Sequence, residues 1–196
     1  GEPRAPAALR VGGVRIAGGR LHAAARVDPR ATGVLAATFR ARGRTVRFDV
    51  AIPPSGEIRI DRRLPAGLRP ARSGTLQLGY AGDDRVLPAG VRLRAAAGAA
   101  ELSRPGVRAE GAAFTVRGSI SRRAAGRVRI RVEYADAHGE VRTATGGARI
   151  RHGHWSLSMA RPGDAAPGAS LSVTARYAGS RARDLAGAQT VAAVRL

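Results

Sequence analysis

The chain contains the same series of short motifs twice. The stretch "LQLGYAGDDRVLPAGVRL" begins at Leu76, and the related stretch "VTARYAGSRARDLAGAQTVAAVRL" closes the sequence about a hundred residues later. Successive offsets of 93, 97 and 103 residues align the early segments, the two Tyr-Ala-Gly motifs and the two Val-Arg-Leu motifs. The offset changes where turns are expected, and folds tolerate insertions at turns. Two copies of one domain, residues 1–96 and residues 97–196, are therefore expected.

Within each copy, apolar and polar residues alternate over short segments that are bounded by Gly, Pro, Ser or Asp. Such alternation predicts half-buried β-strands. The inward positions of the clearest segments are expected to be Leu35, Ala37 and Phe39; Val128, Ile130 and Val132; and Trp155, Leu157 and Met159. Alanine-rich runs such as "HAAARV" favour a helix by propensity, but Gly or Pro interrupts each run before it gains an apolar stripe of helical spacing. About seven short strands per copy indicate an all-β, two-sheet sandwich.

Two further features of the repeat suggest specific local structures. The run "RAAAGAA" over residues 94–100 is expected to be a hinge between the copies. Tyr80 and Tyr177 are expected to end the penultimate strands, each with its ring in the core and its hydroxyl bonded to a backbone group near the sheet corner. The Ala-Gly that follows each tyrosine would then let the chain turn into the last strand.

The order of these motifs resembles that of the bacterial immunoglobulin-like repeats found in secreted and surface proteins of high-GC bacteria. The residues that carry the resemblance are Phe114, Val116, Gly118 and Ile120; Val128 to Tyr134; Gly153 to Leu157; Leu64 and Pro65; Tyr80 to Asp83; and Val91 and Leu93. The second copy departs from the pattern at Ser180, where the family has an aspartate, and the first copy at Ile58, where the family has a tryptophan. The resemblance implies two tandem immunoglobulin-like (Greek-key) β-sandwich domains.

The charge of the chain is strongly positive and consists of arginine alone. There are 34 arginines and no lysines against 14 acidic residues, which gives a net charge of +20. Such a charge favours acidic partners, but it divides almost evenly between the copies, at +11 and +9, whereas a binding groove would concentrate it. Cysteine is absent, so disulfides, thiolate metal sites and cysteine nucleophiles are excluded.

One strand nevertheless predicts a basic face. In "GRVRIRVEY", Arg127, Arg129 and Arg131 occupy the positions opposite the inward Val128, Ile130 and Val132. If this strand neighbours the last two strands of its copy, Arg176 and Arg195 join the same face. A possible anion-binding face is therefore predicted in the second copy, while the first copy has Val34, Ala36 and Thr38 at the corresponding positions. The alternative is a solvated face whose arginine stems cover the sheet.

Other clusters of polar residues are interpreted as turns. His152 and His154 flank Gly153 and would point to one side of a strand, but no third or fourth metal ligand is evident. Asp83 and Asp84 alone do not supply the six to eight oxygen ligands that calcium requires. The acidic residues Glu133, Asp136 and Glu140 are expected to belong to a polar hairpin loop. No metal site is therefore predicted.

The sequence contains no Gly-x-Ser-x-Gly motif and no phosphate-binding loop, so neither catalytic residues nor cofactors are expected. The chain is interpreted as a non-catalytic spacer or adhesive pair from a larger secreted or cell-surface bacterial protein, with any signal or anchor outside this segment. Its expected partners are other proteins or acidic cell-surface polymers.

Nucleic acid is not favoured as a partner because aromatic residues are scarce. Membrane insertion is not expected because no apolar run approaches ~20 residues. The segment is expected to be a monomer. Binding of an anionic polymer, acidic glycan or nucleic acid, and an accessory role beside a secreted hydrolase remain alternatives.

Overall fold

A computed structural model describes residues 4–166 and 168–195, and every regular element within these ranges is a β-strand. The predicted all-β fold is confirmed. The chain forms two compact units: unit 1 comprises Gly1–Glu101 with Ala178–Gln189, and unit 2 comprises Leu102–Tyr177 with Thr190–Leu196. The division at residues 96 and 97 stays a prediction. The described part contains no helix long and apolar enough to cross a membrane.

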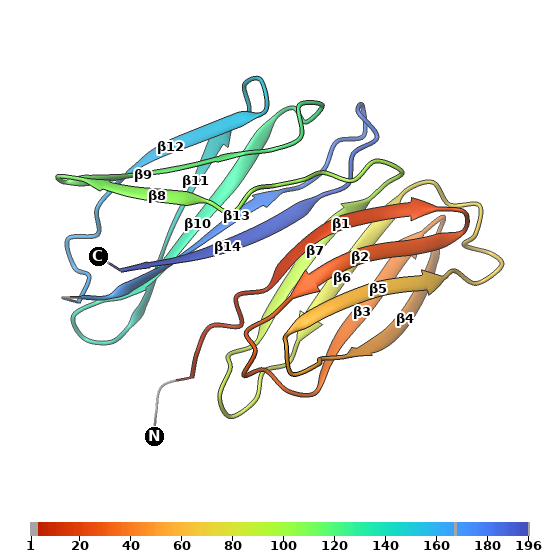
Figure 1. The fold of residues 1–196 in the computed structure, drawn as a ribbon, viewed down its shortest axis with the longest axis horizontal. Helices are drawn as coiled ribbons and strands as arrows, with labels where there is room; N and C mark the ends of the chain where they lie inside the picture. The colour runs from red at the N-terminus through yellow and green to blue at the C-terminus, as the bar shows by residue number, and fades with distance from the viewer. Residues whose placement is uncertain (1–3, 167, 196) are drawn as a thin grey trace. The chain divides into compact units, whose positions relative to one another are not determined.

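Unit 1 contains seven strands arranged in two sheets (Figure 1). The strands are β1 (Arg10–Ala17), β2 (Arg20–Arg26), β3 (Val34–Ala41), β4 (Arg44–Ala51), β5 (Glu57–Arg63), β6 (Gly74–Tyr80) and β7 (Ala89–Ala95). The strands β1-β2-β5 are neighbours in one sheet, where β1 also pairs with the start of β14 (Ala188–Arg195) at Val11 and Gln189, and the other sheet has the order β4-β3-β6-β7. The chain passes from one sheet to the other after β2, β4 and β5, and this path makes the unit a Greek-key sandwich.

The second copy repeats this topology. Its strands are β8 (Gly106–Glu110), β9 (Ala113–Ser119), β10 (Arg127–Ala135), β11 (Val141–Arg149), β12 (His154–Ala160), β13 (Ser170–Tyr177) and β14 (Ala188–Arg195). Within the copy they follow the orders β12-β9-β8 and β11-β10-β13-β14, which correspond to β5-β2-β1 and β4-β3-β6-β7 of the first copy. The prediction of two tandem β-sandwich domains is confirmed.

The core lies where the alternation of the sequence placed it. In β3, Leu35, Ala37 and Phe39 are buried while Val34 and Ala36 are exposed. The inward residues of β10 are buried in the same way, and Trp155 of β12 is 3% exposed. Burial of large apolar side chains from both sheets supplies most of the favourable free energy of such a fold.

A backbone bridge between a lead segment and a late loop occurs twice at equivalent positions. Ala5 forms a parallel bridge with Val86, and Gly98 forms one with Leu185. In both cases the N–H of the lead segment donates to the carbonyl of the residue just before its bridge partner. Ala5 donates to Arg85, and Gly98 donates to Asp184. The bridges are related by offsets of 93 and 99 residues, and β7 and β14 also begin 99 residues apart. The offset of 103 suggested by the Val-Arg-Leu motifs is therefore wrong for the start of the last strand.

The run predicted to be a hinge is part of this arrangement. Ala95, Ala96 and Ala100 are almost fully buried. The Ala96 carbonyl accepts a hydrogen bond from Ile16, and the Gly98 carbonyl accepts one from Ala186. Part of the run is therefore packed within unit 1, where its small side chains allow a close approach of the backbone. The inter-domain hinge over residues 94–100 stays a prediction.

The Tyr-Ala-Gly motifs are partly as expected. Tyr80 and Tyr177 end β6 and β13 with their rings buried, and Gly82 and Gly179 have φ of 84° and 94°, a conformation that glycine adopts readily. Among the described residues, neither tyrosine hydroxyl has a hydrogen-bond partner of ordinary geometry. The Tyr80 hydroxyl lies near the Asp83 carboxylate and the backbone of Thr32.

Candidate anion-binding face

The three arginines of β10 share one exposed face. Arg127, Arg129 and Arg131 are exposed, and the alternating Val128, Ile130 and Val132 are buried. Because side chains alternate along a strand, all three guanidinium groups leave the same side of the sheet. This face is the outer surface of the sheet that contains β11, β10 and β13.

Strand pairing brings two more arginines to this face. Arg129 lies opposite Arg176 of β13, as the sequence suggested. Arg127 lies opposite Arg149 of β11, a residue that sequence reasoning missed. The aliphatic stem of Arg127 also passes over Gly147 of β11. Arg149 could have been found from the sequence. In the antiparallel β10–β11 hairpin, the first residue of β10 lies opposite the last residue of β11.

The two remaining predicted members differ from the others. Arg131 forms an ion pair with Glu133, with its Nη2 atom 2.7 Å from Oε1. Arg195 is exposed but ends β14, near the C-terminus in Figure 1 and away from the loop that follows Arg176. The loop after β13 ends where β14 begins, at Ala188. Arg195 follows seven residues later, and at about 3.3 Å per residue it lies roughly 23 Å from that loop along the strand. It does not join the other arginines.

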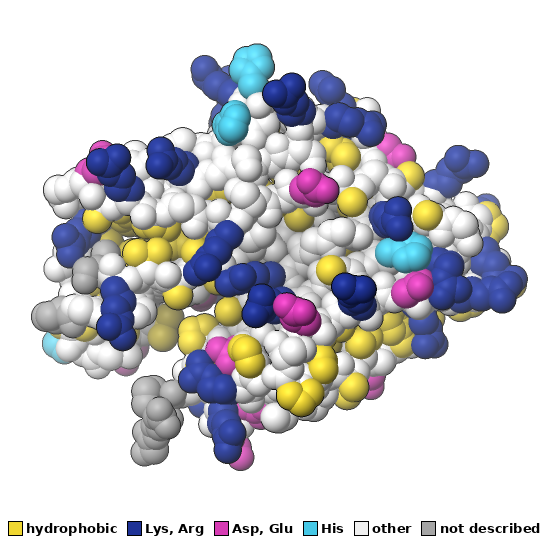
Figure 2. Space-filling model, viewed as in Figure 1, with side chains coloured by type: hydrophobic (Ala, Val, Ile, Leu, Met, Phe, Trp, Pro, Cys, Tyr) yellow, Lys and Arg dark blue, Asp and Glu magenta, His cyan; other side chains and the backbone are white. Residues whose placement is uncertain are grey.

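We define the arginine patch as Arg127, Arg129, Arg149 and Arg176. The side chains of Arg127, Arg129 and Arg149 have no hydrogen bond or ion pair with any described residue. Like charges directly opposite each other on neighbouring strands destabilise a sheet. The patch is therefore a local concentration of positive charge, although Figure 2 shows arginines spread widely over the surface.

The positions of unit 1 that correspond to the arginine patch are uncharged. They are Val34, Ala36, Ala51 and Gly79, in the register that brings Arg127 opposite Arg149 and Arg129 opposite Arg176. Unit 1 has arginines elsewhere on this face, with Arg47 opposite Thr38 and Arg92 opposite Gln77. Anion binding by the second copy alone stays a prediction.

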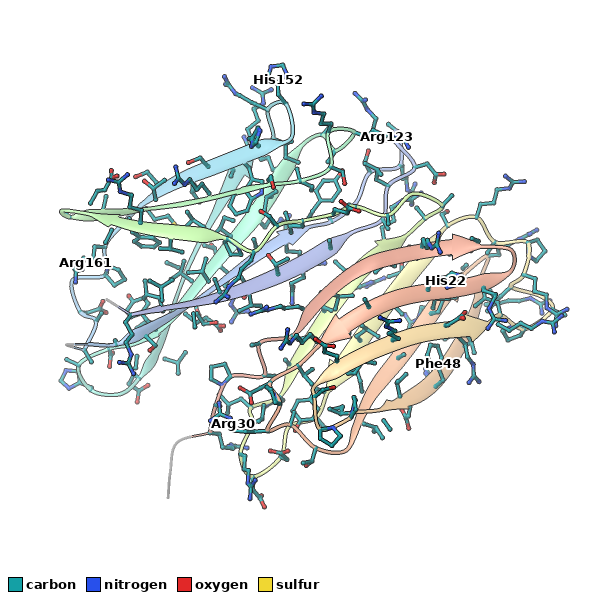
Figure 3. All side chains as sticks on the ribbon, in the orientation of Figure 1. His22, Arg30, Phe48, Arg123, His152 and Arg161 are labelled. Atoms are coloured by element: carbon teal, nitrogen blue, oxygen red, sulfur yellow. The ribbon has the colours of Figure 1, made fainter. Side chains whose placement is uncertain are left out.

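The outer face of the other sheet of unit 1 has acids among its arginines. On β2 and β5, His22 lies opposite Asp61 and Arg26 lies opposite Glu57, although Arg20 lies opposite Arg63 (Figure 3 labels His22). Arg20 Nε lies 2.7 Å from Asp61 Oδ1, and this guanidinium holds the pKa of the Asp61 carboxyl below its usual range. Acids thus compensate the arginines of this face, whereas the arginine patch contains no acid.

Asp83 has a structural role in unit 1. Its Oδ2 accepts hydrogen bonds from the N–H and hydroxyl of Thr32, at 2.9 and 2.8 Å. Its Oδ1 accepts from the N–H groups of Arg85 and Val86, both at 2.8 Å. The nearby Tyr80 hydroxyl, these N–H groups and Thr32 hold the pKa of Asp83 well below its usual range. Its carboxylate oxygens thus fix the loop that carries the bridge to Ala5, whereas Asp84 is exposed.

The low pKa of Asp83 predicts an acid-sensitive contribution to stability. A carboxyl whose pKa is lower in the folded than in the unfolded state stabilises the fold above its unfolded pKa, near 3.8, and this contribution disappears as the pH falls further. Asp83→Asn is therefore expected to lower the urea midpoint at pH 7 and to lose less stability than the wild type between pH 4 and pH 2. Asp84→Asn is the matched control and should follow the wild type at every pH. Equal acid losses in wild type and Asp83→Asn would contradict this role.

The predicted polar hairpin contains a second structural carboxylate. Asp136 is 3% exposed, and its Oδ1 accepts hydrogen bonds from the N–H groups of His138 and Glu140, each at 2.9 Å. Arg142 Nε donates to its Oδ2 at 2.9 Å. Burial opposes ionisation, but the N–H groups and the guanidinium prevail and lower the pKa of Asp136. Glu140 contributes its backbone to the contacts of Asp136, whereas Glu133 pairs with Arg131, so the three carboxylates do not form one site.

The two histidines belong to a hairpin turn, as interpreted from the sequence, and do not occupy alternate strand positions. His152 and Gly153 form a two-residue turn with φ of 51° and 81°, closed by mutual backbone bonds between Arg151 and His154. Figure 3 shows His152 at the tip of this turn, before β12. Among the described residues, no three His, Cys, Asp or Glu side chains lie close enough to hold a metal ion together.

The fold and its surface define a tandem β-sandwich protein with one arginine-rich sheet face. No protein-family model and no curated protein matches the sequence. Among solved structures, the chain is similar to a tetra-tandem repeat in the extending region of a large adhesion protein (18% identity, 96% of this chain, TM-score 0.38), and it spans about half, 48%, of that chain. It is also similar to a two-domain fibronectin type III segment from chicken tenascin (11% identity, 96% of this chain and 97% of that chain, TM-score 0.31). A third similar structure is a 1.5-MDa bacterial ice-binding adhesin (14% identity, 99% of this chain and 65% of that chain, TM-score 0.31).

Proposed function

We propose that the chain is a structural and adhesive module of a larger secreted or cell-surface bacterial protein, without catalysis of its own. The observation that carries the proposal is the placement of its charged groups. Asp83 and Asp136 accept several hydrogen bonds each and stabilise loops, whereas the arginine patch lies on the outer surface of a sheet. A charged sheet surface suits attachment to an extended partner better than it suits enclosure of a small substrate.

The repeated architecture supports the structural part of this role. Both copies use the same seven-strand topology and the same bridge between lead segment and late loop. A chain built from such repeats places its binding surfaces on well-packed units, and each added copy extends the length that the protein can span. The second copy would supply the adhesive surface and the first would act as a support.

Co-sedimentation with washed bacterial cell envelopes tests the adhesive role. The chain is expected to sediment with envelopes at about 0.05 M NaCl and to be released as salt screens the attraction. A neutral β-sandwich of similar size should remain in the supernatant and controls for trapping. If the chain also stays in the supernatant at low salt, the adhesive role is rejected.

A further inference from the structure

We propose that the arginine patch binds a linear anionic polysaccharide, one that carries carboxylate or sulfate groups. The inference rests on the proposed adhesive function and assigns it a ligand class and a surface. Three of the four residues are exposed arginines on β10 and β11 without a described partner, and Arg176 adjoins them from β13. The occupant is identified by charge complementarity to this face.

The spacing of the patch suits a polymer better than a single small anion. Neighbouring strands lie about 4.8 Å apart, and residues two apart on one strand are separated by about 6.6 Å. Arg127 and Arg149 form one cross-strand pair. Arg129 and Arg176 form a second pair, two residues further along β10. Successive anionic groups of one polymer could contact both pairs at once, and several simultaneous contacts raise affinity without a deep pocket.

The energetics of the sheet also favour an anionic occupant. Like-charged residues in directly opposed positions repel each other, and the outward acid of β10, Glu133, is already paired with Arg131. A bound polyanion would relieve this repulsion and form charge-assisted hydrogen bonds. Guanidinium groups bind carboxylate and sulfate-like oxygens in a bidentate manner, which a lysine ammonium cannot do.

The residues around the patch favour a polysaccharide over a nucleic acid. The neighbouring outward positions are Thr145 and Gly147 on β11 and Ser172 and Thr174 on β13. The hydroxyl groups of Thr145, Ser172 and Thr174 can hydrogen-bond to sugar hydroxyls, whereas single-stranded nucleic acids are usually held by stacking on aromatic rings. No aromatic side chain occupies an outward position of β10, β11 or β13 in the described residues.

The test compares two variants of equal charge by their retention on immobilised heparin, a sulfated polysaccharide. The patch variant carries Arg127→Thr, Arg129→Thr and Arg149→Thr, since threonine suits an exposed strand. The control carries Arg108→Thr, Arg117→Thr and Arg161→Thr, which lie on β8, on β9 and just after β12. The patch variant is expected to bind about tenfold more weakly at 0.1 M NaCl, with a shallower dependence of affinity on salt, while the control keeps most of the wild-type affinity.

Each alternative result overturns the proposal in a distinct way. Equal losses in both variants would show that net charge, and not the patch, causes retention. Unchanged binding of the patch variant would place the contact elsewhere. If the patch variant lost binding to single-stranded DNA but kept its affinity for heparin, the ligand would be a nucleic acid. A thermal midpoint equal to or above that of the wild type shows that the patch variant is folded.

The envelope assay separates failure of this inference from failure of the proposed function. If the wild type binds envelopes but the patch variant binds them equally well, the adhesive function stands and the assigned surface is wrong. If the wild type binds neither envelopes nor heparin, both proposals are rejected.

Discussion

Gly153→Ala is expected to destabilise unit 2 by about 2 kcal/mol, and Gly56→Ala to destabilise unit 1 by at least as much. The two glycines have φ of 81° and 71° and occupy equivalent turns. A methyl group on Gly153 would lie 3.0 Å from the Ile120 carbonyl oxygen, and one on Gly56 would overlap the Val27 carbonyl oxygen. In both turns the glycine carbonyl accepts a hydrogen bond from the same residue, Ile120 or Val27, so the turn cannot move away without losing that bond.

Urea unfolding followed by circular dichroism measures both changes, and the fluorescence of the single tryptophan, Trp155, reports on unit 2. Gly163→Ala and Gly12→Ala are matched controls in units 2 and 1. Neither control glycine has a positive φ, and an added methyl group would meet no atom within 4 Å. If Gly153→Ala and Gly56→Ala unfold at the wild-type urea concentration, the two turns do not have the structure described.

Trp155→Ala is expected to lower the free energy of unfolding of unit 2 by about 3–5 kcal/mol, the usual effect of removing a large buried aromatic side chain. Trp155 is 3% exposed on β12, and its indole packs so closely on Gly118 of β9 that a methyl group there would overlap the ring. Ile58, which is also buried, occupies the equivalent place in unit 1. Trp155→Ile should therefore recover part of the loss, because a β-branched apolar residue already fills this position in the other copy.

Circular dichroism is the suitable probe here, since both variants lack the tryptophan. Trp155→Phe is the conservative comparison and should lie between wild type and Trp155→Ile in stability. A Trp155→Ala variant as stable as the wild type would mean that the side chain is exposed. It would then contradict the placement of the core of unit 2.

Much of the fold follows from local chemistry and was predictable from sequence. Alternation in β3 and β10 fixes which side chains face inward, because a shift of one residue would expose Phe39 or Ile130 to water. The bridges of Ala5 and Gly98 were not predictable, since they join backbone groups distant in sequence and leave no side-chain pattern. The packing of Ala95, Ala96 and Ala100 was not predictable for a related reason, because alanine and glycine are typical both of linkers and of closely packed backbone.

The candidate face was only partly predictable. Arg127, Arg129 and Arg131 follow from the period of one strand, and Arg176 follows from the expected neighbour of that strand. Arg149 required the register of the β10–β11 hairpin, and the distant place of Arg195 required the path of β14. Likewise, the pairing of Arg131 with Glu133 depends on side-chain conformations that strand periodicity does not determine.

The same register in both copies is the central structural claim, and nuclear Overhauser contacts between backbone protons test it most directly. Contacts are expected between Arg129 and Arg176 and, at the equivalent place, between Ala36 and Gly79. Directly opposed residues of antiparallel strands have backbones about 5 Å apart, close enough to give these signals. Observation of both pairs would establish one sandwich made twice and the arginine patch on the second. Absence of either pair, or a one-residue shift that turned Arg129 toward the core, would contradict the account.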